Sequence, residues 1–205
     1  MSELINEGII QFSEASASKD PVPGGGGVSA LAGSLAASLA EMVTHLTAGK
    51  KRYAQYEEEI QSVMKQAEEL RVRLLECIEK DAEAFEPLAR AYAMDKNTEG
   101  YAEKMEACLH EAAKPPFMIL EFCTKVIELD ERLAVIGSKL AVSDAGTSVM
   151  LAHGAMYGAY LNVRVNTRLM KDTAYARDVE GRAEALLEEY AARAMNCFSA
   201  VRERL

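Results

Sequence analysis

The chain has 205 residues, of which 49% are hydrophobic, and a formal net charge of −9. This composition is typical of one folded domain with a substantial core, and it excludes an intrinsically disordered chain. The negative charge argues against general nucleic-acid binding, although a local cluster of Lys and Arg can still bind a small anion.

Targeting signals are not evident in this sequence. The first residues lack the basic and apolar regions of a signal peptide. The longest apolar runs, 28–40 and 149–163, are too short or too polar for a membrane span, so we expect no membrane association. The four cysteines form no CxxC pair, which predicts reduced core thiols and a cytoplasmic protein.

A stretch rich in proline and glycine follows the first predicted helix, which spans Leu4 to Ala17. It reads Pro21-Val-Pro-Gly-Gly-Gly-Gly-Val28 and runs directly into a helix expected to begin at Val28 or Ser29. Glycine lets a ligand approach the backbone closely, and a helix N-terminus offers free N–H groups to an anion or a polar planar ligand. The alternative is a loop squeezed between packed helices where side chains do not fit, and the sequence leaves both open.

The helix expected to end near Ala48 is built mainly from small residues. One apolar stripe is formed by Leu31, Leu35, Leu39, Met42 and Leu46. Gly, Ala and Ser cover its other faces, which predicts a buried helix packed closely against its neighbours.

A long helix is predicted from Ala54 to Met94, with apolar residues at alternating spacings of three and four. Asp81 stands on this apolar seam. A buried carboxylate must be paired, protonated or functional, and burial raises its pKa toward the range that a general acid or base needs. The alternative is a structural carboxylate paired with a neighbouring helix.

The second half of the chain also reads as helical. A helix begins near Thr98, is broken or kinked at Pro115-Pro116, and is followed by a short helix or turn over 131–139. Ser143-Asp144 is expected to cap a second small-residue helix over 145–169. A last amphipathic helix starts near Tyr175. We therefore predict a single all-α domain, 1–205, folded as a multi-helix bundle around two buried small-residue helices.

Several polar residues have both a plain and a functional interpretation. Lys50 and Lys51 follow a helix end, where cations are favourable, and together with Lys139 they are suited to hold carboxylates. Asp144 is either a first-turn acid or a contact to a polar ligand edge. Asn162 and Asn166, one turn apart, satisfy backbone groups or bind a heterocycle edge. The histidines lack metal-ligand spacing, so we expect no metal site.

Several segments together are similar to the cyclodeaminase/cyclohydrolase family, which includes the cyclodeaminase part of formiminotransferase-cyclodeaminase and free-standing methenyltetrahydrofolate cyclohydrolases. The stretch 21–33 resembles the family's PxPGGGSVSALAG signature. Four further segments look similar in the same order: 46–53, 81–85, 143–146 and 161–166. Two positions depart from the pattern, because Gly27 stands where serine is common and Ser138 where asparagine is frequent.

The resemblance implies an all-helical homodimer that acts on a tetrahydrofolate derivative, with folate as the substrate and no separate cofactor. It implies that Asp81 is the catalytic carboxylate and that the glycine loop and the Ser143 turn line the folate site. The substrate-binding residues expected on this basis are Pro23, Gly24, Gly25, Gly26, Gly27, Ser29, Lys50, Lys51, Lys139, Ser143, Asp144 and Asn162.

Hydrolysis of methenyltetrahydrofolate to formyltetrahydrofolate is the expected reaction, because no formiminotransferase domain accompanies these residues. One carboxylate can stabilise the amidinium cation, deprotonate the attacking water and return the proton. Two alternatives remain at this stage. One is formiminotetrahydrofolate cyclodeaminase, in which ring closure releases ammonia, and the other is a non-catalytic helical folate-binding or structural protein.

Overall fold

The computed structural model describes residues 4–205, and within that range it contains α-helices and short 3-10 turns but no β-strand. The elements are η1 (Leu4–Asn6), α1 (Ile9–Ser16), α2 (Gly25–His45), η2 (Lys51–Tyr56), α3 (Glu57–Tyr92), α4 (Tyr101–Ile136), α5 (Val142–Thr167) and α6 (Thr173–Arg204). The all-α fold predicted from the sequence is thereby confirmed.

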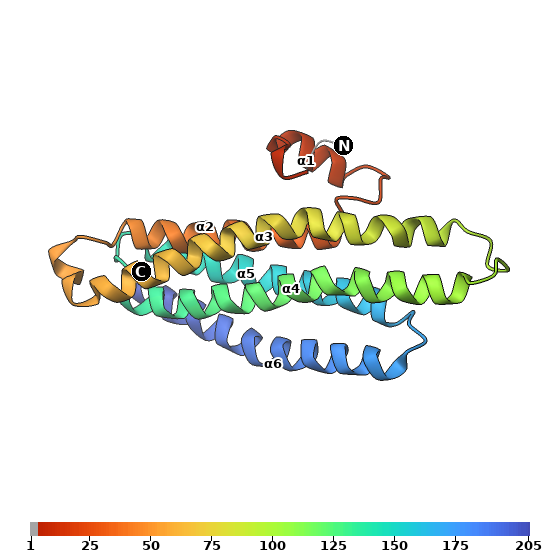
Figure 1. Ribbon diagram of the computed structural model, residues 1–205. Helices are drawn as coiled ribbons and strands as arrows, with labels where there is room; N and C mark the ends of the chain where they lie inside the picture. The colour runs from red at the N-terminus through yellow and green to blue at the C-terminus, as the bar shows by residue number, and fades with distance from the viewer. Residues whose placement is uncertain (1–3) are drawn as a thin grey trace.

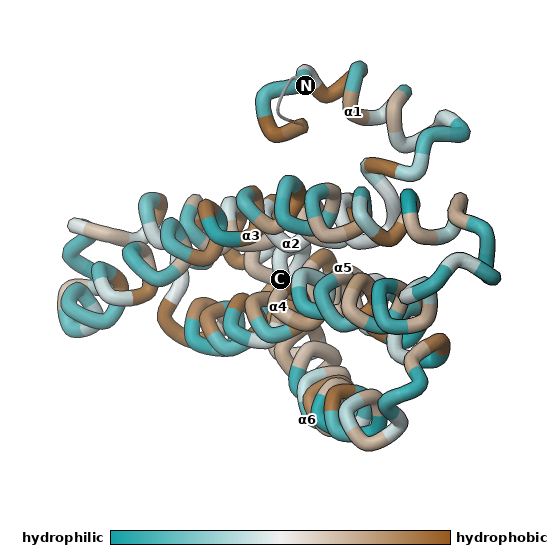
Figure 2. Tube along the Cα trace, turned by 45° about the vertical axis from the view of Figure 1, so that its right-hand side comes forward, coloured by the Kyte–Doolittle hydropathy of each residue, from teal (hydrophilic) through white to brown (hydrophobic). Residues whose placement is uncertain are grey.

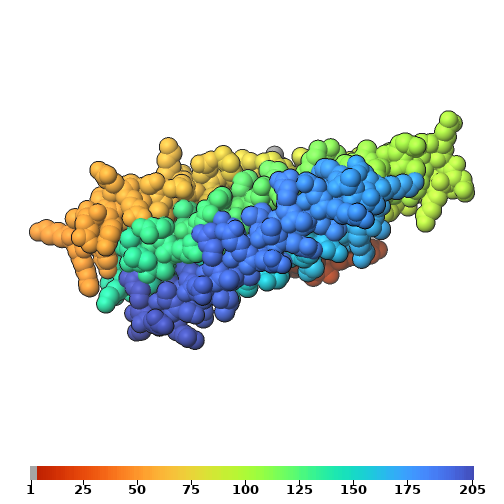
Figure 3. All heavy atoms as spheres, turned by 90° about the horizontal axis from the view of Figure 1, so that it is seen from below, coloured from red at the N-terminus to blue at the C-terminus, as the bar shows by residue number. Residues whose placement is uncertain are grey.

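Four long helices form the bundle, and α6 lies along its side (Figure 1). In the ring, α2 packs against α3 and α5, α4 packs against the same two helices, and α2 lies diagonally opposite α4. The helix α6 packs against α4 and α5, whereas α1 stands apart from the bundle above α3. The result is an elongated molecule, with η2 at one end and the loop between α3 and α4 at the other (Figure 3).

The small-residue helices α2 and α5 do lie in the centre of the fold, but α2 buries a different face from the one we expected. Its buried residues are mostly Gly, Ala and Ser, while the large side chains Leu35, Met42 and Leu46 are exposed. Close approach requires this arrangement, because a Cβ on Gly33 would lie 3.0 Å from the Cys123 sulfur and 3.1 Å from a Leu74 methyl group. By contrast, hydrophilic residues recur along α3, α4 and α6 (Figure 2).

Among the described helices, α2 is the one that is long and apolar enough to cross a membrane. The apolar run 28–40 seen in the sequence is only part of this helix and was too short to indicate a span. Of its most apolar window, 56% is buried inside the bundle, as in the core helix of a globular protein.

Several helix boundaries differ from those expected. The helix predicted from Leu4 to Ala17 is divided into η1 and α1, and α3 begins at Glu57, after η2, and not at Ala54. The helix α2 begins at Gly25, so the glycines form its first turn. The helix α4 continues through Pro115 and Pro116 to Ile136. The helix α5 begins at Val142 after Ala141, and no side chain caps it, so Asp144 lies in the first turn and Ser143-Asp144 is not the N-cap.

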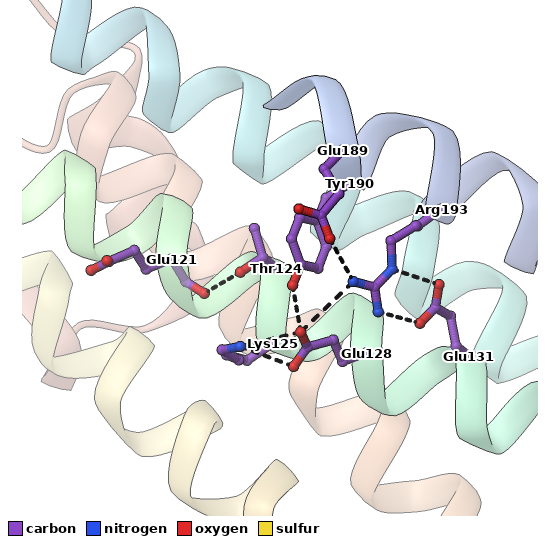
Figure 4. Close-up of polar contacts among 8 residues, drawn as sticks. All are labelled: Glu121, Thr124, Lys125, Glu128, Glu131, Glu189, Tyr190 and Arg193. Atoms are coloured by element: carbon purple, nitrogen blue, oxygen red, sulfur yellow. Dashed lines mark hydrogen bonds and ion pairs between the residues drawn. The ribbon is translucent and has the colours of Figure 1, made fainter. Parts of the chain in front are cut away.

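Ion pairs on the surface fasten α6 to α4 (Figure 4). The Arg193 guanidinium binds Glu131 through two nitrogens, at 2.9 and 2.6 Å, and also reaches Glu189 on its own helix. The Tyr190 hydroxyl donates to the Glu128 carboxylate. A bidentate Arg–carboxylate pair fixes orientation as well as distance, so this network sets how α6 lies on the bundle.

A second polar junction lies in the core. The Ser148 hydroxyl oxygen is 2.8 Å from the Ala36 carbonyl oxygen and 2.7 Å from Oδ2 of Asp130, which is completely buried. Serine has one hydroxyl hydrogen and the carbonyl only accepts. A protonated Asp130 that donates to Ser148 makes both contacts full hydrogen bonds at once, because the Ser148 hydrogen is then left for Ala36 O. Burial raises the pKa of Asp130 well above its usual range, in agreement with this proton count.

The replacement Asp130→Asn tests that neutral state. A carboxyl whose pKa is raised in the folded protein binds more protons there than in the unfolded chain, so its contribution to stability falls as pH rises above about 4, by about 1.4 kcal/mol per pH unit until the folded pKa is reached. The amide does not ionise. We therefore expect the free energy of unfolding of Asp130→Asn to increase relative to wild type between pH 4 and pH 8 in urea titrations. A difference that is constant with pH contradicts a neutral Asp130.

Candidate active site

A cavity of about 170 Å³ lies where the first turn of α2 meets α3, α4 and α5. It is smaller than the roughly 300 Å³ or more of sites that enclose a drug-sized ligand, so it suits a ring system and not a whole long ligand. The lining residues are Pro21, Val22, Gly24, Gly25, Gly26, Asp81, Phe85, Ala112, Pro116, Asn162, Val165 and Asn166.

Asp81 is the ionisable residue of this cavity. It extends from the apolar seam of α3 toward the first turn of α2. Burial raises the pKa of Asp81 to about 6, and a hydrogen bond from the Gly27 backbone N–H opposes that shift. The positive end of the α2 dipole also favours the carboxylate. Such a group can release and accept a proton near neutral pH, as acid–base catalysis requires.

Glycine is needed where α2 meets Asp81. The first backbone bond of the helix runs from Val28 N–H to Gly24 O at 3.0 Å, so the N–H groups of the preceding glycines have no partner within the helix. A Cβ on Gly26 would lie 2.2 Å from Asp81 Oδ1. The run of glycines therefore brings backbone donors that have no helical partner against a carboxyl group, which no larger residue at Gly26 permits.

Asn162 enters the cavity from α5. Its Nδ2 donates to Gly158 O of its own helix at 2.9 Å, and a Cβ on Gly25 would lie 2.8 Å from the same nitrogen. Asn166, one turn later, also lines the cavity. The sequence pattern distinguishes Asn166 as an amide one turn after Asn162, but the substrate-binding residues expected from the family resemblance do not include it.

Three other residues expected to bind substrate lie beside the cavity and not in its lining. The ring of Pro23 is buried against Gly27. Gly27 reaches the site only through its backbone N–H to Asp81. The Ser29 hydroxyl donates to Gly25 O at 2.7 Å and faces Gly158, so Ser29 packs between α2 and α5.

The remaining expected residues lie at the other end of the bundle. Backbone bonds to side chains hold this end together: Ser138 N–H donates to Thr47 Oγ1 at 2.8 Å, and Lys139 N–H donates to the Tyr53 hydroxyl at 3.1 Å. Lys50 and Lys51, at the start of η2, belong to the same end. Asp144 is eighteen residues from Asn162 along α5, which is about 27 Å at 1.5 Å per residue.

Ser143 lines a separate and mainly apolar groove of about 510 Å³, formed by the start of α5 and the end of α6. Within one chain, the structure thus joins the glycine turn, Asp81 and Asn162 in one place, and Lys50, Lys51, Lys139, Ser143 and Asp144 in another. Among residues 4–205, no three His, Cys, Asp or Glu side chains are grouped so that they could hold a metal ion.

Gly26 and Gly27 offer a matched pair of substitutions. Gly26→Ala forces a methyl group against the Asp81 carboxyl, whereas a Cβ on Gly27 has its nearest contact with Pro23 Cβ at 3.3 Å. We expect Gly26→Ala to lower the free energy of unfolding by about 1–3 kcal/mol, the usual cost of overpacking, and Gly27→Ala to cost less than half of that. Urea titration of both variants measures this. Equal losses contradict the close packing of Asp81 against Gly26.

Residues 8–185 match the family model described as Formiminotransferase-cyclodeaminase. Methenyltetrahydrofolate cyclohydrolase of Methylorubrum extorquens is 36% identical over 204 residues, which cover 98% of each chain. Formimidoyltransferase-cyclodeaminase of Sus scrofa is 25% identical over 190 residues, or 91% of this chain and 35% of that protein.

A solved structure agrees with these matches. The crystal structure of formiminotetrahydrofolate cyclodeaminase from Thermotoga maritima superposes with a TM-score of 0.84 at 30% identity, covering 99% of this chain and 98% of that one. The chain therefore belongs to the formiminotransferase-cyclodeaminase family.

Proposed function

We propose that this protein hydrolyses methenyltetrahydrofolate to formyltetrahydrofolate and that Asp81 is its general base and acid. The observation that carries the proposal is the Asp81 carboxyl, half-buried against the N-terminal turn of α2, where desolvation raises its pKa to about 6, in a cavity of ring-system size. Full-length similarity to a methenyltetrahydrofolate cyclohydrolase supports the substrate. We place the enzyme in the cytoplasm and assign it no metal or cofactor.

The reaction follows from the chemistry of the substrate. In methenyltetrahydrofolate, a cationic amidinium carbon bridges N5 and N10. The Asp81 carboxylate stabilises that cation and removes a proton from a water molecule, whose oxygen bonds to the bridging carbon. Asp81 then returns the proton to the nitrogen that leaves as one C–N bond breaks, and the new hydroxyl group loses its remaining proton to solvent as the formyl C=O forms.

Formiminotetrahydrofolate cyclodeaminase activity is the second candidate, favoured by the Thermotoga maritima structure of that name. In that reaction a folate nitrogen attacks the formimino carbon and ammonia leaves with a proton from the same carboxyl group. The methenyl chromophore separates the two activities, because hydrolysis consumes it and cyclodeamination produces it. Purified protein that changes the chromophore in neither assay and binds no folate contradicts both proposals.

Removing the charge of Asp81 tests its role. We expect Asp81→Asn to lower kcat by about 100-fold or more, because a positioned acid–base group contributes about 10²–10⁴-fold. Glu83→Gln, an exposed carboxylate two residues later on α3, is the control and should stay within twofold of wild type. An active Asp81→Asn enzyme would place the base elsewhere.

The pH profile provides a second measurement. The base must be ionised to accept a proton, and burial has raised the pKa of Asp81 to about 6. The value of kcat/KM should therefore reach a plateau above that pKa and fall about tenfold per pH unit below it. A profile that stays flat down to about pH 4.5 contradicts Asp81 as the base, because only a group with a pKa near the ordinary aspartate value of about 3.9 would still be ionised there.

We propose further that two copies pair through the outer faces of α2 and α5. Large apolar side chains are exposed on both helices, among them Leu35 at 51% and Leu161 at 66%. Contiguous exposed apolar residues of this kind mark an interaction surface. The two helices are antiparallel, since the start of α2 meets Asn162 near the end of α5. A twofold axis near the middle of α2 thus places the partner's end of the bundle that carries Lys50, Lys51 and Lys139 next to the cavity. These lysines can then hold the carboxylates of a folate tail.

The pairing is tested by Leu35→Glu. A charge at the centre of the apolar face should convert a dimer into a monomer in analytical ultracentrifugation, and activity should fall with it. Val135→Glu is the control, because Val135 is 63% exposed on α4, the helix diagonal to α2. Loss of the dimer in both variants, or in neither, contradicts the α2–α5 interface.

A further inference from the structure

A backbone carbonyl group of α4 lacks its helical donor beside the cavity. In an α-helix, the carbonyl of residue 112 accepts from the N–H of residue 116. Residue 116 is proline, which has no N–H. The structure supplies the missing donor from another helix, because Asn166 Nδ2 on α5 lies 2.9 Å from Ala112 O. Pro116 and Ala112 both line the cavity.

The other N–H of the Asn166 amide is also engaged. Asn166 Nδ2 lies 3.1 Å from Asn162 O, the carbonyl one turn back on its own helix. Both partners can only accept hydrogen bonds, so the nitrogen of this amide must face them. With both hydrogens used, Oδ1 is the polar atom of Asn166 that remains to meet a ligand in the cavity, and it can only accept.

The neighbouring Asn162 is turned the same way. Its Nδ2 donates to Gly158 O and lies 2.8 Å from the position of a Cβ on Gly25, and its Oδ1 lies 3.3 Å from the same position. The α5 wall of the cavity therefore presents the acceptor oxygen of Asn166, with Asn162 Oδ1 one turn away. Such a wall favours a ligand edge that carries N–H donors.

We propose that Asn166 Oδ1, assisted by Asn162, is the specificity determinant that binds the N–H edge of the reduced pterin ring. This inference rests on the proposed folate substrate. In methenyltetrahydrofolate, N5 and N10 carry no hydrogen, whereas N3, N8 and the 2-amino group are the donors of the ring system. Binding the donor edge at Asn166 leaves the opposite edge, with the reacting carbon, free to face Asp81.

A pair of ligands and a pair of variants test the assignment. The ligands are methenyltetrahydrofolate and its analogue with a methyl group in place of the 2-amino group, which keeps the shape and removes two donors. Dissociation constants are measured in an Asp81→Asn background, in which turnover is slow compared with the binding measurement. We expect the analogue to bind about tenfold more weakly when Asn166 is present. Asn166→Ala should reduce that ratio to below about threefold.

Two further variants separate ligand recognition from structural support. Val165→Ala changes the apolar wall of the same cavity, so it should weaken both ligands alike and preserve the tenfold ratio. Asn166→Ala leaves Ala112 O without a donor, and adding Pro116→Ala restores an N–H there. The double variant should regain thermal stability but not discrimination between the ligands.

The outcomes are distinct from those that test the function. If the parent protein binds the two ligands equally, or if the Asn166→Ala/Pro116→Ala double variant discriminates as the parent does, Asn166 does not bind the donor edge. Wild-type turnover of methenyltetrahydrofolate together with either result overturns this inference alone. Failure of the wild-type protein to bind or convert any folate overturns the proposed function itself.

Discussion

The contact on which the site depends is that between the Asp81 carboxyl group and the first turn of α2. Two opposing effects act on this carboxyl group. Burial on the α3 seam disfavours its charge, whereas the Gly27 N–H and the end of the helix dipole favour it. Because no Cβ fits at Gly26, the backbone of α2 lies directly against the Asp81 carboxyl group. The helix N–H groups and the dipole therefore act on the carboxylate at close range. The balance leaves the carboxyl group with a pKa of about 6, close to neutral.

The packing of the bundle serves the same contact. Small residues let α2 lie deep between α3 and α5, with Gly33 against Leu74 and Cys123. That depth brings the N-terminus of α2 to Asp81 and leaves the large apolar residues of α2 outward. The core junction of Asp130 and Ser148 joins α4, α5 and α2 from the inside. Stability and chemistry thus depend on the same close approach of helices.

Much of the fold was predictable from the sequence, because helical periodicity is strong and strand signals are weak. The all-helical character, the central small-residue helices and the anomalous position of Asp81 followed from local pattern. The buried face of α2 could not be predicted in this way. Local pattern alone favours burial of the Leu stripe, whereas the close fit of the neighbouring helices requires that the Gly/Ala face is buried. Likewise, Pro115 and Pro116 indicate a break from local geometry alone, whereas tertiary contacts keep α4 continuous.

The site was predictable only in part for a related reason. Asp81, the glycines and Asn162 meet within one chain, which spacing along separate helices could not reveal. Asp144 lies some 27 Å from Asn162 along α5 at 1.5 Å per residue, and the lysines lie at that same far end of the bundle, a separation that sequence order conceals. The role of Asn166 depends on a carbonyl freed by Pro116, fifty residues earlier in the chain and on another helix.

The ionisation of Asp81 in the folded protein tests this account most directly. Carbon-13 NMR titration of carboxyl-labelled aspartate, with Asp81→Asn to identify the resonance, gives its pKa without reference to any reaction. The account predicts a midpoint near 6. A midpoint near 4, the ordinary value for aspartate, would show that the carboxyl group is solvated and would contradict a proton poised for catalysis at the N-terminus of α2.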